Sequence, residues 1–170
     1  RVSAMADEQR SISFPDGFLW GTATAAHQIE GGNVNSDWWA FEHAEGTPVA
    51  EPSGDACDSW NRWSEDLALV SDMGLNAYRF SIEWARIEPE PGEFSMAALD
   101  HYKQMCAAAR DLGILPVVTF HHFTSPRWLA ERGGFEWSET PDRFAAMVSK
   151  AAAHLGEPAR RGEVVEGHHG

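Results

Sequence analysis

Two stretches of the sequence, MGLNAYRFSIEW at residues 73–84 and LGILPVVTFHHF at residues 112–123, decide the fold. In each of them a glycine is followed by an apolar residue and then by a short strand that leads into polar and aromatic residues. Gly74, Gly113 and Gly156 each end a segment with helical periodicity, so the pattern recurs with a period of about 40 residues. Helices and strands that alternate at this spacing are typical of βα units that build a parallel sheet.

The spacing of apolar residues around these glycines predicts three strands and three helices. Ser95 is the expected N-cap of the second helix, and Thr140 is the expected N-cap of the third, with Pro141 at its first position. We predict strands at about residues 18–24, 76–82 and 114–121, and helices at 58–73, 96–112 and 141–155.

Two architectures are built from such units. A doubly wound nucleotide-binding sheet usually has a glycine-rich phosphate loop after its first strand. The corresponding residues 25–32 read AAHQIEGG, which fits neither of the two common phosphate-binding patterns. A (β/α)8 barrel instead has its active site at the C-terminal ends of its strands. The sequence therefore favours an α/β fold that comprises about the first three βα units of an incomplete (β/α)8 TIM barrel.

The composition excludes several classes of partner. The chain has 13 Lys and Arg against 26 Asp and Glu, a formal net charge of −13, which disfavours nucleic acid and anionic membranes. It has no apolar run of about 18 residues, and because residues 1–14 contain no apolar segment we expect no secretory signal there. Cys57 and Cys106 lack the spacing of metal ligands and are expected to be reduced thiols in a cytoplasmic protein.

Polar and aromatic residues gather where the predicted strands end. Because these ends meet at one mouth of a barrel, we expect the side chains to form a polar site lined by aromatic rings. Amides and imidazoles both donate and accept hydrogen bonds, which suits the hydroxyl groups of a ligand. The residues are His27, Gln28 and Glu30 after the first strand, Arg79 and Glu83 on the second, and His121, His122 and Phe123 after the third.

Several of these residues allow more than one interpretation. Arg79 points inward and needs a carboxylate partner, which a strand outside this sequence could supply. Glu83 is either a catalytic carboxylate or, in the interpretation we prefer, a buried partner of Arg79 or Arg86. Either His121 or His122 could be a structural histidine that binds the backbone.

A metal site made by His27, Glu30 and one of the two later histidines is a weaker alternative, because no third ligand has regular spacing. We therefore predict no metal and no organic cofactor. Trp60 and Trp63 lie on one helical stripe and are expected in the core.

Three long motifs resemble glycoside hydrolase family 1, the β-glucosidases and their relatives. They are FPDGFLWGTATAAHQIEGG at 14–32, DSWNRWSEDLALVSDMGLNAYRFSIEWARIEPEPGEF at 58–94 and GILPVVTFHHFTSPRWL at 113–129. The resemblance covers residues 14–157. It implies a (β/α)8 barrel and retaining hydrolysis of a small-molecule β-glycoside, and it leaves the sugar preference and the oligomeric state open.

The resemblance also implies roles for individual residues. Gln28 matches the glutamine that holds hydroxyls of the glycone, the sugar whose bond is cleaved. His122 matches the histidine that binds the same sugar, and Phe123 stands where many members have Trp. Arg79 matches the arginine that keeps the nucleophilic glutamate ionised. Trp128 matches an aromatic position in the third loop.

The family's two catalytic glutamates lie in T-x-N-E-P and T-E-N-G motifs, and neither motif occurs in these 170 residues. The segment SETP at 138–141 is a helix start, and ARRGEVVEGHHG at 159–170 does not read as a fourth strand. We therefore expect a flexible N-terminus at 1–13, the first part of a barrel at 14–157 and an unrelated disordered tail at 158–170. We expect a truncated chain that is inactive alone; a non-catalytic carbohydrate-binding remnant or a gene fragment without function are the alternatives.

Overall fold

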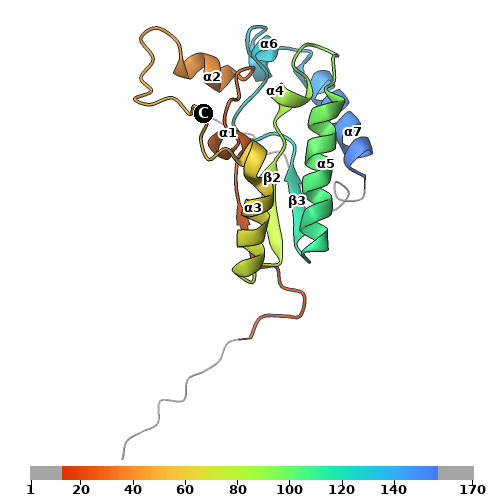
Figure 1. Ribbon diagram of the computed structural model, residues 1–170. Helices are drawn as coiled ribbons and strands as arrows, with labels where there is room; N and C mark the ends of the chain where they lie inside the picture. Colours follow the sequence, from red (N-terminus) through yellow and green to blue (C-terminus); the bar gives the residue numbers. More distant parts are fainter. Residues whose placement is uncertain (1–12, 157–170) are drawn as a thin grey trace, which may run out of the picture.

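The computed structural model describes residues 13–156, which form a three-stranded parallel sheet with helices packed against it (Figure 1). The strand order is β1-β2-β3, so consecutive strands are neighbours, and each connection between parallel strands passes through a helix. The predicted α/β class is confirmed. In chain order the elements are β1 (Gly21–Ala23), α1 (Ala26–Ile29), α2 (Asp37–Glu42), α3 (Ser59–Asp72), β2 (Ala77–Ser81), α4 (Trp84–Ile87), α5 (Met96–Asp111), β3 (Leu115–Thr119), α6 (Arg127–Ala130), the 3-10 helix η1 (Gly134–Glu136) and α7 (Thr140–Leu155).

The three long helices α3, α5 and α7 lie along the sheet, with α5 between the other two (Figure 1). Side chains of β2 alternate between the two faces of the sheet. Tyr78 and Phe80 enter the hydrophobic core under these helices, whereas Arg79 points to the opposite face, which in a barrel is the inner one. Leu99 and Met147, both fully buried, join α5 and α7 to this core.

The predicted helices agree with the observed ones to within about two residues. Gly74 and Gly113 follow the first two long helices with φ of 71° and 75°, the left-handed conformation that glycine adopts easily. The hydroxyl of Ser95 accepts a hydrogen bond from the backbone N–H of Ala98 at 3.2 Å, so its predicted capping role is confirmed.

Two local predictions are wrong. Thr140 is the first residue of α7 rather than its N-cap, because its hydroxyl donates to the carbonyl of Gly134 and leaves the helix end uncapped. The first strand is shorter than the predicted 18–24, since its ladder with β2 pairs only residues 21–23.

The ends of the chain carry two further predictions. The flexible N-terminus expected at residues 1–13, apart from Ser13, and the tail expected at 158–170 lie outside the described residues. Among residues 13–156, no helix has the length and the apolar character that crossing a membrane requires.

Candidate functional site

The loops that follow the three strands meet at one end of the sheet, where α2, α4 and α6 lie near the top of Figure 1. Two hydrogen bonds join the first loop to the third: the N–H of Asp37 donates to the carbonyl of Ser125, and the N–H of Ser125 donates to Oδ1 of Asp37, both at 2.9 Å. The second loop joins them through Thr124, whose hydroxyl donates to Oε2 of Glu83 at 2.7 Å. The three strand ends therefore form one connected structure.

A small cavity of about 100 Å³ opens in this structure. Gln28 and Phe123, two of the residues predicted to bind substrate, line it together with His27 and Trp38. The ring of His122, the third predicted residue, lies 4.3 Å from the ring of Phe123, measured between centroids. Amide, imidazole and aromatic side chains that follow the first and third strands thus converge here.

The backbone of Phe123 is held in an uncommon conformation. Its φ is 68°, in the left-handed region that residues other than glycine rarely adopt. Such strain persists only where surrounding contacts over-determine the conformation, and it concentrates at functional sites. Here it turns the Phe123 ring toward Trp38, whose centroid lies 6.5 Å away, so that two aromatic rings border the cavity.

Arg79 lies apart from this cavity, on the inner face of the sheet. Its Nε donates to the hydroxyl of Thr119 on β3 at 2.9 Å, which fixes the guanidinium over the neighbouring strand. That it stands beside a nucleophilic glutamate stays a prediction.

Glu83 is held differently from the interpretation that we preferred. Its carboxylate accepts hydrogen bonds from Asn33 Nδ2 at 2.8 Å, from the Thr124 hydroxyl and from the N–H of Ala85 at 3.2 Å. Its interpretation as an ion-pair partner of Arg79 or Arg86 is wrong, because Glu83 is the N-cap of α4 and its side chain turns back toward the loops. Arg86 instead pairs with Glu30, at 2.8 Å between Nε and Oε2.

Burial raises the pKa of Glu83 to about 8, and the neighbouring charge of Glu30 acts in the same direction. The hydrogen bond from Thr124 opposes this rise without cancelling it. In the folded chain the carboxyl therefore holds its proton at a pH where an exposed glutamate has lost it.

This pKa predicts that the folded state loses stability as the pH rises from about 4.5 to about 8. In that interval the folded chain binds more protons at Glu83 than the unfolded chain, so the free energy of unfolding falls by up to about 1.4 kcal/mol per pH unit. The stabilisation that Glu83 contributes is complete at a pH below the pKa of its carboxyl in the unfolded chain. It is lost as the pH rises through the pKa of the same carboxyl in the folded chain. Urea unfolding across this pH range should show a flatter slope in Glu83→Gln, and parallel slopes would contradict the prediction.

The residues of the weaker metal alternative are engaged elsewhere. Glu30 accepts hydrogen bonds from Arg86 and from the hydroxyl of Tyr102, and burial raises the pKa of Glu30 although both partners lower it. His27 contacts Glu42 and Asn33. Within residues 13–156, no group of three or more His, Cys, Asp and Glu side chains is arranged to hold a metal ion.

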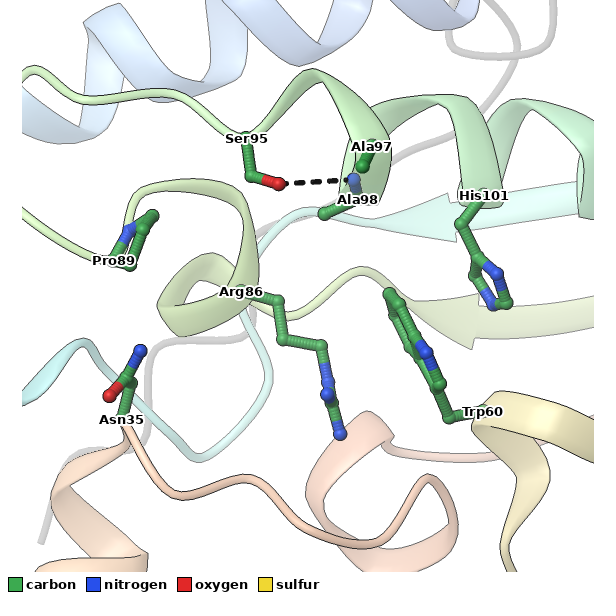
Figure 2. A pocket seen from close by; sticks show the side chains of 8 residues that line it. All are labelled: Asn35, Trp60, Arg86, Pro89, Ser95, Ala97, Ala98 and His101. Atoms are coloured by element: carbon green, nitrogen blue, oxygen red, sulfur yellow. Dashed lines mark hydrogen bonds between the residues drawn. The ribbon is translucent and has the colours of Figure 1, made fainter.

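A larger hollow, of about 390 Å³, lies on the helix side of the molecule and is shown in Figure 2. At the centre of this hollow three side chains stack on one another. The rings of Trp60 and His101 lie 3.8 Å apart between centroids, and the Arg86 guanidinium lies 4.3 Å from the centroid of the Trp60 ring. Trp60, expected in the core, is instead half-buried and packs against it, and His101 and Arg86 cover the two faces of its ring. The stack therefore supports Arg86 and offers no free aromatic face for a sugar.

Sequence reasoning missed Asn33, which lies in irregular loop, and Trp38, which lies in α2, a helix too short to show a helical period. A tryptophan within a polar stretch was the available signal for Trp38. Two other aromatic or imidazole candidates are structural. His121 is buried, with Nε2 3.1 Å from the hydroxyl of Ser125, and Trp128 is buried in the core, where its Nε1 donates to the carbonyl of Glu88.

Comparison with known proteins identifies the family of this chain. The sequence model of glycosyl hydrolase family 1 matches residues 10–159. The chain belongs to glycosyl hydrolase family 1. Its resemblance to that family, based on the three motifs, is confirmed.

Individual members of glycosyl hydrolase family 1 share much of this sequence. β-Glucosidase A of Acetivibrio thermocellus is 38% identical over 153 residues, covering 86% of this chain and 34% of that protein. β-Glucosidase A of Thermotoga maritima is 43% identical over 139 residues, covering 78% of this chain and 31% of that protein. The chain thus spans about a third of the length of these relatives.

A solved structure of the β-glycosidase BGL167 superposes on the chain with a TM-score of 0.84 and 59% identity, covering 85% of this chain and 35% of that one. The predicted incomplete (β/α)8 barrel is confirmed: the described residues supply a partial parallel sheet with its helices.

Proposed function

We propose that this chain forms the glycone-binding part of a retaining β-glycoside hydrolase of the β-glucosidase type, with Gln28, His122 and Phe123 as contacts to the sugar. The observation that carries the proposal is the cavity that unites Gln28 with Phe123 and has His122 against its aromatic wall. An amide and an imidazole provide donors and acceptors for sugar hydroxyls, and the rings of Phe123 and Trp38 provide apolar surface for C–H groups.

The bond-breaking chemistry of such an enzyme requires two carboxyl groups about 5–5.5 Å apart, one as acid and base and one as nucleophile. We propose that neither group is among these 170 residues, since both family motifs for them are absent. Arg79 would support the nucleophile: a guanidinium held on the inner face of the sheet stabilises a nearby carboxylate in its ionised form. The proposed substrate is a small-molecule β-glycoside in the cytoplasm.

Two measurements on the purified 170-residue chain test this proposal. We expect no hydrolysis of an aryl β-glucoside even at high protein concentration, and weak binding of glucose detected by saturation-transfer NMR. Gln28→Ala should abolish the binding, whereas Gln104→Ala, which changes an exposed glutamine on α5, should leave it intact. Turnover would contradict the absence of the catalytic carboxyls, and a lack of binding would contradict the sugar site.

A further inference from the structure

The two ring nitrogens of His27, on the cavity wall, have partners of opposite kinds. Nε2 lies 2.9 Å from Oε1 of Glu42, and Nδ1 lies 3.2 Å from Nδ2 of Asn33. An amide nitrogen can only donate, so Nδ1 must accept and carries no proton. An ionised carboxylate can only accept, so Nε2 must carry the proton. These contacts define a neutral imidazole with its proton on Nε2.

The state of Glu42 fixes the role of Nε2 only. Partial burial raises the pKa of Glu42, but hydrogen bonds from His27 and Ser53 outweigh it and lower the pKa overall. Ser53 contributes two of these bonds to Oε2, from its N–H at 3.0 Å and from its hydroxyl at 2.7 Å. Glu42 is therefore ionised at neutral pH and accepts the proton of His27 Nε2.

Asn33 connects His27 to the buried carboxyl of Glu83. The same Nδ2 that faces His27 Nδ1 donates to Oε2 of Glu83 at 2.8 Å, and the side chain is almost fully buried. Oδ1 of Asn33 is also buried and has no hydrogen-bond partner among residues 13–156. The two contacts of Nδ2 therefore determine which way the amide faces.

A reversed amide would require a different protonation state. Its oxygen would then face His27 Nδ1 and Glu83 Oε2; Glu83 already holds a proton that it could donate, so the contact with His27 decides, and it is favourable only if Nδ1 carries a proton. The charged groups around the contacts are Glu42 and Asp37 near His27, and Glu30 and Arg86 near Glu83. The observed orientation thus selects a His27 ring without a proton on Nδ1.

The position of His27 bears directly on Gln28. Both residues belong to α1, a single four-residue turn that is too short to be stable without contacts from outside it. The turn is anchored at its start by the N–H of Ala26, which donates to the hydroxyl of Ser81 at 2.7 Å, and just after its end by Glu30. Between these anchors His27 is the buried side chain, while Ile29 is half-buried and its carbonyl accepts from the N–H of Cys57, so the His27 ring is one of the contacts that fix the rotation of the turn.

We propose that Asn33 is a positioning residue for the cavity: its amide nitrogen binds His27 and Glu83 together, holds the His27 ring neutral with its proton on Nε2, and thereby sets the direction in which Gln28 faces a ligand. Asn33 itself does not line the cavity. The expected effect of Asn33 on sugar binding rests on the proposed function, whereas the protonation state of His27 does not.

Long-range 15N–1H NMR of the imidazole rings tests the proposal in the full 170-residue chain near neutral pH. In the unsubstituted chain we expect the His27 ring to carry its proton on Nε2 only. In Asn33→Asp, carboxylates face both nitrogens, and we expect a second proton on Nδ1. Asn35→Asp is the matched control: it makes the same change two residues away at an exposed side chain and should leave His27 unaltered.

Two results would overturn the proposal. One is an unsubstituted chain in which Nδ1 of His27 carries a proton, a measurement that needs no variant to fold. The other is an Asn33→Asp ring identical to that of the control. Glucose binding then separates this inference from the proposed function: weaker binding in Asn33→Asp than in Asn35→Asp extends it to the ligand, and a chain that binds no glucose but shows the expected ring protons contradicts only the proposed function.

Discussion

Gly31→Ala is expected to lower the free energy of unfolding by about 2–5 kcal/mol. Gly31 has a φ of 79°, which costs a residue with a Cβ atom about 1–2 kcal/mol. An added Cβ would also lie only 2.2 Å from the carbonyl oxygen of Asp55, which belongs to the backbone and cannot rotate away. The loop that carries Asp55 would have to shift, although the N–H of Cys57 binds the carbonyl of Ile29 at 3.2 Å and ties the two segments together.

The neighbouring glycine provides the control for this prediction. Gly32 also has a positive φ, of 56°, but a Cβ at this position meets nothing within 4 Å. Gly32→Ala should therefore show only the conformational cost, about 1–2 kcal/mol. Urea unfolding followed by tryptophan fluorescence measures both, and equal losses would show that the contact with Asp55 does not contribute.

Arg86→Met is expected to lower the free energy of unfolding by about 3–5 kcal/mol, because it leaves the carboxyl of Glu30 buried without its cation. The side chain of Glu30 is 6% exposed, and after the change the hydroxyl of Tyr102 would be its remaining strong donor. Arg86 also donates to the carbonyl of Gly31 and covers the Trp60 ring, so methionine preserves part of the packing and loses the charge.

An exposed ion pair is the comparison for Arg86. Arg62 and Glu65 lie 2.6 Å apart on α3 with side chains 58% and 59% exposed, so Arg62→Met should produce no measurable change. Combining Arg86→Met with Glu30→Gln should recover part of the loss, since the buried charge is then removed as well. If the double variant is no more stable than Arg86→Met, the uncompensated charge is not the cause.

The regular part of the fold could be predicted from the sequence because its pattern repeats. Helices ended by Gly74 and Gly113, each followed by a strand, defined two βα units with nearly correct bounds. Helices α1, α2, α4 and α6 could not be predicted, since segments of four to six residues are too short to show a helical period. Tertiary contacts stabilise them, as the hydrogen bond from Ala26 to Ser81 does for α1.

The candidate site was predictable only at the level of its strand ends. Gln28, His122 and Phe123 could be proposed because each follows a strand or matches a family motif. Asn33 could not, because its importance depends on a distance across the fold to Glu83, fifty positions along the chain. The pairing of Glu83 was wrong for the same reason: charge complementarity suggested an arginine, but capping of α4 turned the carboxylate to a different set of donors.

The reciprocal hydrogen bonds between Asp37 and Ser125 have a consequence for engineering. These bonds join two segments that lie on either side of the cavity and far apart in the sequence. The conformation of each segment therefore depends on the other. A chimera that imports the first of them from another enzyme while retaining the second would lose the bond to Oδ1 of Asp37 wherever the donor segment has no acidic residue at that position, and would displace Trp38 relative to Phe123. Exchanges at this rim should succeed only when both segments come from the same donor.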